Sequence, residues 1–200
     1  DRRRWILFGR PARRTAEDHR RRAERLTATI AALGPTFIKL AQVFSARADI
    51  LPEPYLSAIG RLQDRVPPHP PEEIEEVIAQ ELGQPVDQIF QHFDRRPVAA
   101  ASLGQVHRAR VAGEEVAVKV LRPGVEELIA VDLDISFRVL YLLNILAPNH
   151  HVRAVTTVVR EFSVRIREEM DFREEARHIA DFREHFGRDP RVRAPRIYEA

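Results

Sequence analysis

The 200-residue sequence predicts an α+β protein in which a small antiparallel sheet follows an all-helical segment. Apolar residues recur at helical spacing from residue 15 to residue 64, whereas residues 105–111 and 115–121 alternate polar and apolar side chains. Helical spacing returns after residue 125. The composition, 44% hydrophobic and without cysteine, is sufficient for a core and excludes disulfides.

Proline and glycine divide the first half of the chain into short helices. Gly34-Pro35 and Pro52-Glu53-Pro54 interrupt the helical pattern, and Gly83 ends it again. The helices expected here cover residues 15–33, 36–47, 52–64, 72–82 and 86–93. The proline run at 67–71 is the clearest linker.

The second half begins with strands and ends with helices. Residues 98–102 are small and apolar, and the two alternating stretches join through Ala112-Gly113-Glu114, which predicts an antiparallel hairpin. Two helices are expected after it, over residues 125–147 and 152–186, and a further strand from Arg196. We therefore divide the chain into a helical extension (1–66), a linker with helices (67–93) and a sheet-containing domain (94–200).

Charge is concentrated at the start of the chain. Residues 1–25 carry ten arginines together with Trp5 and Phe8, although the net charge of the whole chain is only +2. Such a segment suits either an anionic membrane surface or a solvated arm. Nucleic-acid binding is disfavoured because few aromatic side chains accompany these cations. No stretch reaches the ~20 apolar residues that span a bilayer.

The two lysines of the chain, Lys39 and Lys119, stand out among 32 basic residues. A lysine is a compact point charge that suits a phosphate or a buried carboxylate, although two lysines could also remain by chance. Lys119 is the last residue of a Val-Ala-Val-Lys motif inside the strand predicted over 115–121, after the small-residue run Ala99-Ala100-Ala101-Ser102. A later helix carries candidate partners for it: Glu168, Glu169, Asp171, Glu174 and Glu175. This order is typical of a protein-kinase N-lobe, in which a strand lysine binds nucleotide phosphates and pairs with a helix glutamate.

Three blocks of the sequence resemble the UbiB/AarF/ADCK family of atypical protein-kinase-like proteins. The first is Lys39-Leu40-Ala41-Gln42, which resembles the family's K-x-G-Q motif with alanine in place of glycine. The second is the alanine-rich loop with Gly104-Gln105-Val106-His107, and the third is the run from Glu169 to Ala176, similar to E-x-D followed by R-E-A. Together the blocks span residues 33–176.

This resemblance implies specific roles. Lys119 would bind the nucleotide phosphates beside the backbone of Ala99, Ala100, Ala101 and Ser102, and Glu175 would hold it. Glu169 and Asp171 would be the E-x-D acids, approached by Lys39 from the helical extension. The cofactor would be ATP or ADP with Mg²⁺, whose ligands we expect in a C-terminal lobe outside these residues; within them we expect no metal site.

The resemblance also implies an activity. We expect the ATP-binding portion of an atypical kinase or ATPase in quinone or isoprenoid lipid metabolism, cytoplasmic and peripheral at a membrane. The expected partners are a nucleotide, a lipid or quinone precursor and quinone-biosynthesis proteins. These 200 residues contain no catalytic loop with asparagine and no magnesium aspartate motif, so we expect a fragment with little turnover. The alternative is a non-catalytic scaffold that binds nucleotide or lipid.

Overall fold

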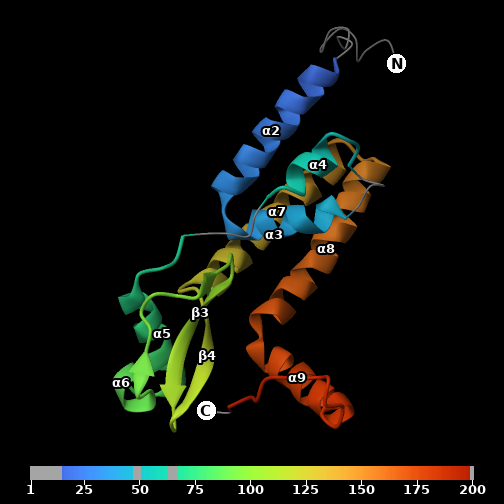
Figure 1. The fold of residues 1–200 in the computed structure, drawn as a ribbon. Coiled ribbons are helices and arrows are strands. Elements are labelled where there is room, and N and C mark those ends of the chain that lie inside the picture. The colour runs from blue at the N-terminus through green and yellow to red at the C-terminus, as the bar shows by residue number, and fades with distance from the viewer. Residues whose placement is uncertain (1–14, 47–50, 63–66, 199–200) are drawn as a thin grey trace, which may run out of the picture. The chain divides into compact units, whose positions relative to one another are not determined.

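The chain divides into two compact units between residues 64 and 65. The computed structural model describes residues 15–46, 51–62 and 67–198 (Figure 1). The arginine-rich residues 2–14 therefore lie outside the described residues, and the rest of the basic segment belongs to the first helix.

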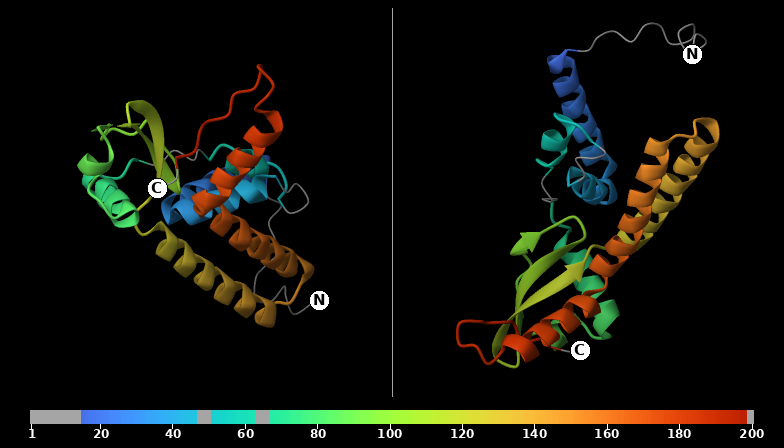
Figure 2. Two further views of the ribbon diagram at one scale, coloured as in Figure 1. Left: turned by 90° about the horizontal axis from the view of Figure 1, so that it is seen from below. Right: turned by 90° about the vertical axis from the view of Figure 1, so that its right-hand side faces the viewer.

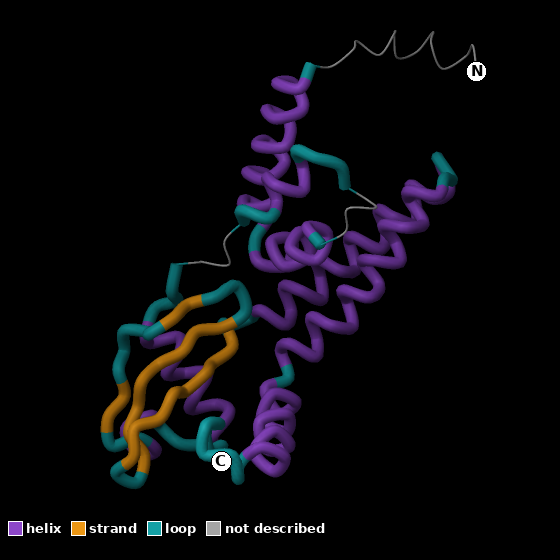
Figure 3. Tube along the Cα trace, turned by 45° about the vertical axis from the view of Figure 1, so that its right-hand side comes forward, coloured by secondary structure: helices purple, strands orange, loops and turns teal. Residues whose placement is uncertain are grey.

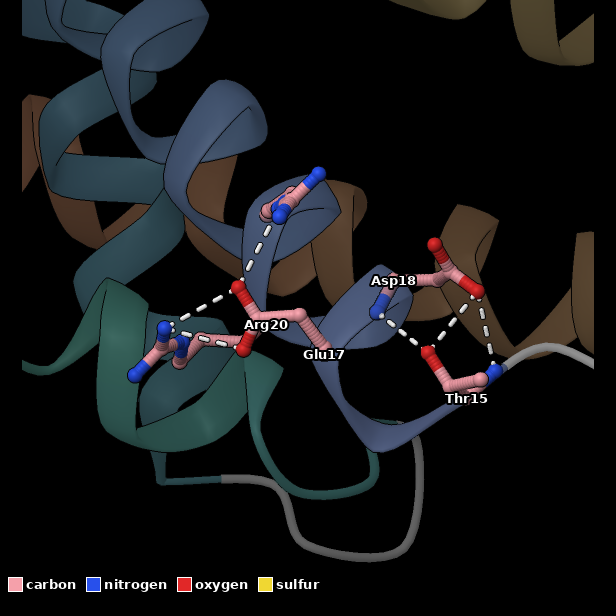
Figure 4. Close-up of polar contacts among 5 residues, drawn as sticks. Thr15, Glu17, Asp18 and Arg20 are labelled. Atoms are coloured by element: carbon pink, nitrogen blue, oxygen red, sulfur yellow. Dashed lines mark hydrogen bonds and ion pairs between the residues drawn. The ribbon is translucent and has the colours of Figure 1, made fainter.

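The first unit is helical, as expected. Its helices are α2 (Ala16–Leu33), α3 (Pro35–Ser45) and α4 (Tyr55–Ile59). α2 begins with a capping box, in which the Thr15 hydroxyl accepts from the Asp18 N–H and the Asp18 carboxylate accepts from the Thr15 N–H (Figure 4). Glu17 binds Arg20 at 2.9 Å and Arg21 at 3.1 Å, so part of the basic segment is a solvated helix with internal ion pairs.

Glycine and proline set the remaining helix limits in this unit. Gly34 separates α2 from α3 with a φ of 102°, and Pro35 occupies the first position of α3. α4 is much shorter than the expected helix over 52–64, because the chain becomes helical only after Pro54 and ends the helix at Gly60. α4 packs on α2, where His19 Nδ1 lies 3.3 Å from the Tyr55 hydroxyl.

The second unit is built on an antiparallel sheet (Figure 3). Its strands are β1 (His92–Phe93), β2 (Ala99–Ala100), β3 (Gly104–Val111) and β4 (Glu114–Leu121). β4 pairs with the whole of β3, whereas β1 and β2 pair with opposite ends of its other edge. The expected helix over 86–93 is wrong in its second half, because α6 (Val86–Ile89) ends before β1.

The β3–β4 hairpin has a two-residue turn. Val111 pairs with Glu114, so Ala112 and Gly113 form the loop, with φ values of 51° and 84°. Positive φ at both positions is the type I′ geometry that matches the twist of a hairpin.

One face of the sheet is covered by α5 (Pro71–Leu82) and α6. Ile74, Ile78 and Val120 form the buried centre of this core, and Val118 and Phe93 pack against it. Gly83 ends α5 in the left-handed conformation at φ 71°, as the sequence predicts. Because side chains alternate along β4, burial of Val118 and Val120 places residue 119 on the opposite face.

Three helices follow the sheet. α7 (Val125–Leu146) and α8 (His150–Met170) form an antiparallel hairpin, and α9 (Phe172–Phe186) follows (Figure 2). The sequence predicted one helix over 152–186, but it breaks at Asp171, whose φ of −84° and ψ of 91° are extended. Among the described residues after α9 there is no strand, so the strand expected from Arg196 is wrong.

Candidate functional site

Lys119 lies on the uncovered face of the sheet. In β4 it is directly opposite Val106 of β3, and its side chain is 44% exposed. The paired strands therefore fix the backbone from which this side chain projects, and its ammonium group is accessible to a ligand.

Glu175 is the partner of this lysine. Lys119 Nζ donates a hydrogen bond to the Glu175 carboxylate, which lies in the first turn of α9. Of the five acids that the sequence offered as partners, the structure pairs this one, the residue that the resemblance indicates. Both side chains are about half exposed, so the pair fixes geometry more than it stabilises the fold.

Phe172 completes the surroundings of the lysine, and the sequence assigned it no role. Its ring centroid lies 4.4 Å from Lys119 Nζ, a cation–π contact. A Cβ at Gly104 would lie 3.7 Å from this ring and only 2.7 Å from the Val120 carbonyl oxygen, so glycine is required there. The sequence offered one signal for Phe172, which directly follows Asp171, the N-cap of the helix that carries Glu175.

The E-x-D acids lie on either side of the helix break. Glu169 is in the last turn of α8, and Asp171 is the N-cap of α9, where its carboxylate accepts from the Arg173 N–H at 3.1 Å. Arg173 Nε also donates to Asp171 at 2.9 Å. This hydrogen bond lowers the pKa of the Asp171 carboxyl below its ordinary value, partly opposed by desolvation. Asp171 thus fixes the start of the helix that presents Glu175.

The alanine-rich loop is tightly folded beside these residues. Ala99 and Ala100 form β2, and the Ala101 N–H donates to the Gly104 carbonyl at 2.8 Å, which closes the loop. Ser102 is fully buried, so its hydroxyl faces inward. Leu103 is buried as well, so Ala101 is the exposed residue of the turn between β2 and β3.

A buried polar chain supports the sheet behind the site. The Gln105 side-chain oxygen accepts from the His69 N–H at 3.0 Å, and its amide nitrogen lies 2.9 Å from His107 Nε2. His107 Nδ1 lies 2.8 Å from the Asp94 carbonyl, and the ring stacks on Phe93. A neutral His107 that is protonated on Nδ1 satisfies both contacts.

A family model and several relatives match this chain. The model for the ABC1 atypical kinase-like domain covers residues 61–200. The chain belongs to the ABC1 atypical kinase-like family. This assignment confirms the resemblance stated from the three sequence blocks, and it confirms the fold class, a kinase-like small antiparallel sheet with several helices.

Named ABC1 relatives come from plants and bacteria. The chain is 42% identical over 180 residues to "Protein ACTIVITY OF BC1 COMPLEX KINASE 1, chloroplastic" of Arabidopsis thaliana, a match of 89% of this chain and 26% of that protein. It is 36% identical over 194 residues to "Probable protein kinase UbiB" of Marinobacter nauticus, a match of 96% of this chain and 34% of that protein. The chain thus spans about a quarter to a third of these relatives.

A solved structure is also similar to this chain. The complex of Rv3197 with erythromycin from Mycobacterium tuberculosis is 31% identical, with a TM-score of 0.57. The match covers 92% of this chain and 47% of that one.

The K-x-G-Q-like block of this ABC1 chain lies in the first unit. Lys39 and Gln42 are on α3, and Ala41, which replaces the motif glycine, is buried there without breaking the helix. The expected approach of Lys39 to the E-x-D acids stays a prediction.

The described residues contain no group of three or more side chains that could hold a metal ion. The Lys119 ammonium group is a hydrogen-bond donor, which suits a phosphate oxygen. No helix among the described residues is long and apolar enough to span a membrane.

Proposed function

We propose that this chain is the nucleotide-binding portion of a UbiB-type atypical kinase or ATPase. The observation that carries the proposal is the ion pair between Lys119 of β4 and Glu175 of α9, beside a tight small-residue loop. In protein kinases a strand lysine held by a helix glutamate binds the nucleotide phosphates. Kinship with proteins named UbiB and BC1 complex kinase supports the same assignment.

Each residue of the site would have a distinct part in holding ATP or ADP. Lys119 would neutralise phosphate charge, and Glu175 would orient its ammonium group. Phe172 would limit the freedom of the lysine side chain by packing under it. Of the run Ala99-Ala100-Ala101-Ser102, the alanines would approach the phosphates, because their small side chains offer little steric hindrance and Ser102 is buried. Magnesium, when bound with the nucleotide, would offset phosphate charge, and its ligands would come from a C-terminal lobe.

We further propose that the whole protein acts on quinone or isoprenoid lipid metabolism at a membrane surface. The support is the name UbiB among the relatives and the cationic start of the chain. The expected setting is cytoplasmic and peripheral, with lipid precursors and quinone-biosynthesis proteins as partners. Lys39 would serve this activity through the K-x-G-Q-like block.

A non-catalytic nucleotide- or lipid-binding scaffold is the second candidate. The Ala101 N–H favours it, because this group donates within the loop rather than outward toward a phosphate. Such a loop would hold a nucleotide less closely than transfer requires.

Nucleotide titration of the full-length protein tests the proposal. We expect Lys119→Ala to weaken ATP binding by about tenfold or more, because a charge-assisted contact is lost, and Glu175→Gln to weaken it less. Lys39→Ala, in the first unit, should affect turnover more than ATP affinity. Arg138→Ala is the matched control, because Arg138 is exposed and pairs with Asp134 on α7.

Equal ATP affinity in the wild type and Lys119→Ala would contradict the nucleotide assignment. ATP binding without turnover in the full-length protein would favour the scaffold.

A further inference from the structure

Arg122 is the one charged side chain that is buried among the described residues. It follows β4 directly and is 7% exposed. Removing a guanidinium from water is costly unless its donors find partners. An aliphatic residue would fill the same space without that cost, so the contacts of Arg122 indicate what the charge is for.

The first set of contacts is with the alanine-rich loop. Arg122 Nε donates to the Ala101 carbonyl at 2.7 Å, and the Arg122 backbone N–H donates to the Leu103 carbonyl at 2.9 Å. The carbonyls on both sides of Ser102 therefore bind one residue. Together with the bond from the Ala101 N–H to Gly104, these contacts fix the loop from both sides.

The second contact is with the proline linker. Arg122 Nη2 donates to the Pro67 carbonyl at 2.9 Å. Two residues further on, the His69 N–H donates to the buried Gln105 side chain at 3.0 Å. The buried side chains of Gln105 and Arg122 thus both bind the linker, and Arg122 also joins the linker to the alanine-rich loop.

The shape of the arginine side chain explains the choice of residue. A planar guanidinium can direct Nε to one carbonyl and Nη2 to another in fixed relative directions, whereas an ammonium group cannot keep both alignments on its flexible stem. Arg122 lies three residues after Lys119, at the end of β4 where Gly104 pairs with Leu121. Arg122 therefore binds the loop and the linker at the part of the sheet that adjoins the proposed phosphate site.

We propose that Arg122 is a positioning residue for the phosphates of the bound nucleotide. It does not touch the nucleotide; it fixes the loop between Ala101 and Gly104 so that the exposed residue Ala101 lies against the phosphates that Lys119 binds. The inference rests on the proposed function and extends it to a residue outside the three family blocks. It predicts an effect on phosphate recognition and none on recognition of the nucleoside.

The test compares Arg122→Lys and Arg122→Met with Arg110→Lys in the full-length protein. Arg110 is the matched control because it is exposed on β3 and pairs with Glu115 at 3.4 Å. ATP and adenosine are titrated separately, and amide hydrogen exchange is measured without ligand. We expect both Arg122 variants to bind ATP about tenfold more weakly, since charged hydrogen bonds that hold the loop are lost. Adenosine affinity should stay within about twofold, and the Ala101 amide should exchange faster.

Methionine is included because its side chain matches the length of the buried aliphatic part of Arg122 and carries no charge. The Arg122→Met variant can therefore fold even where Arg122→Lys does not. In the wild type, ATP should slow exchange of the Ala101 and His69 amides together, whether or not either variant folds. Absence of this joint protection would overturn the proposal.

Unchanged ATP affinity in a folded Arg122 variant, or an equal loss of ATP and adenosine affinity, would also overturn it. If Lys119→Ala weakens ATP binding and Arg122→Lys does not, the positioning role fails and the nucleotide function stands. If the wild type binds no ATP, the nucleotide function fails and this inference fails with it.

Discussion

At the scale of single residues, the Lys119–Glu175 ion pair contributes little to stability and is expected to serve ligand binding. Both side chains are about half exposed, and exposed pairs of this kind contribute at most about 1 kcal/mol to folding. The fold is stabilised instead by the buried apolar side chains of Ile74, Ile78 and Val120. Substitution of the lysine should therefore change ligand binding far more than the free energy of unfolding.

Asp171 gives a prediction of pH dependence. Its pKa is lowered by Arg173, so its charged form stabilises the fold above the ordinary value of 3.8, and this contribution is lost as the pH falls through the lowered pKa. Asp171→Asn keeps a capping oxygen without the charge. We expect the variant to be less stable than the wild type at pH 7, and the difference to shrink below pH 3.8 in urea unfolding. A difference that stays constant from pH 7 to the acid limit would contradict this account.

At the level of elements, the turn of the β3–β4 hairpin contains one residue, Ala112, in a backbone conformation that is unfavourable for alanine. Ala112 has a φ of 51°, although alanine is disfavoured in this region and type I′ turns prefer Asn-Gly. The eight-residue pairing of the two strands holds the turn in place despite this local cost.

Ala112→Asn should relieve the cost at the turn. We expect the free energy of unfolding to rise by up to about 1 kcal/mol, because asparagine tolerates positive φ better than alanine. Thermal or urea unfolding measures the change. Ala112→Val is the opposing control, since a β-branched residue is poorly tolerated there and should destabilise the hairpin. A stabilising valine would show that backbone strain is not the cause.

At the level of the whole molecule, the K-x-G-Q-like block and the proposed nucleotide site belong to different compact units. The first carries the K-x-G-Q-like block, and the second carries the alanine-rich loop, Lys119 and Glu175. The described residues of the two units contain no group of three or more side chains that could hold a metal ion.

We expect these 200 residues to bind ATP but to hydrolyse it slowly, because the sequence has no catalytic loop with asparagine and no magnesium aspartate motif. Loss of a group that stabilises developing charge lowers turnover by roughly 10²–10³-fold. Phosphate release by this chain should be at least about a hundredfold below that of a longer relative such as UbiB, and ATP titration of the same sample would show that it is folded. Turnover equal to that of the longer relative would disprove this expectation.

The sequence predicted well wherever the cause is local. Gly34, Gly83 and the Ala112-Gly113 turn end or join elements through their own backbone preferences, so these limits agree with the structure. Prediction failed where neighbours in space decide. The helix predicted over 86–93 ends at Ile89, because His92 and Phe93 pair with β3, and the helix predicted over 152–186 breaks at an aspartate that caps the next helix.

By itself, the sequence determined the α+β class, the hairpin, the family and the identity of Lys119 as the candidate lysine, because spacing and motif order are properties of the chain. Only the tertiary structure decided which of five acids meets that lysine, placed Phe172 beneath it, and buried Arg122 between the loop and the linker. These contacts join residues up to 56 positions apart, and packing rather than local propensity selects them.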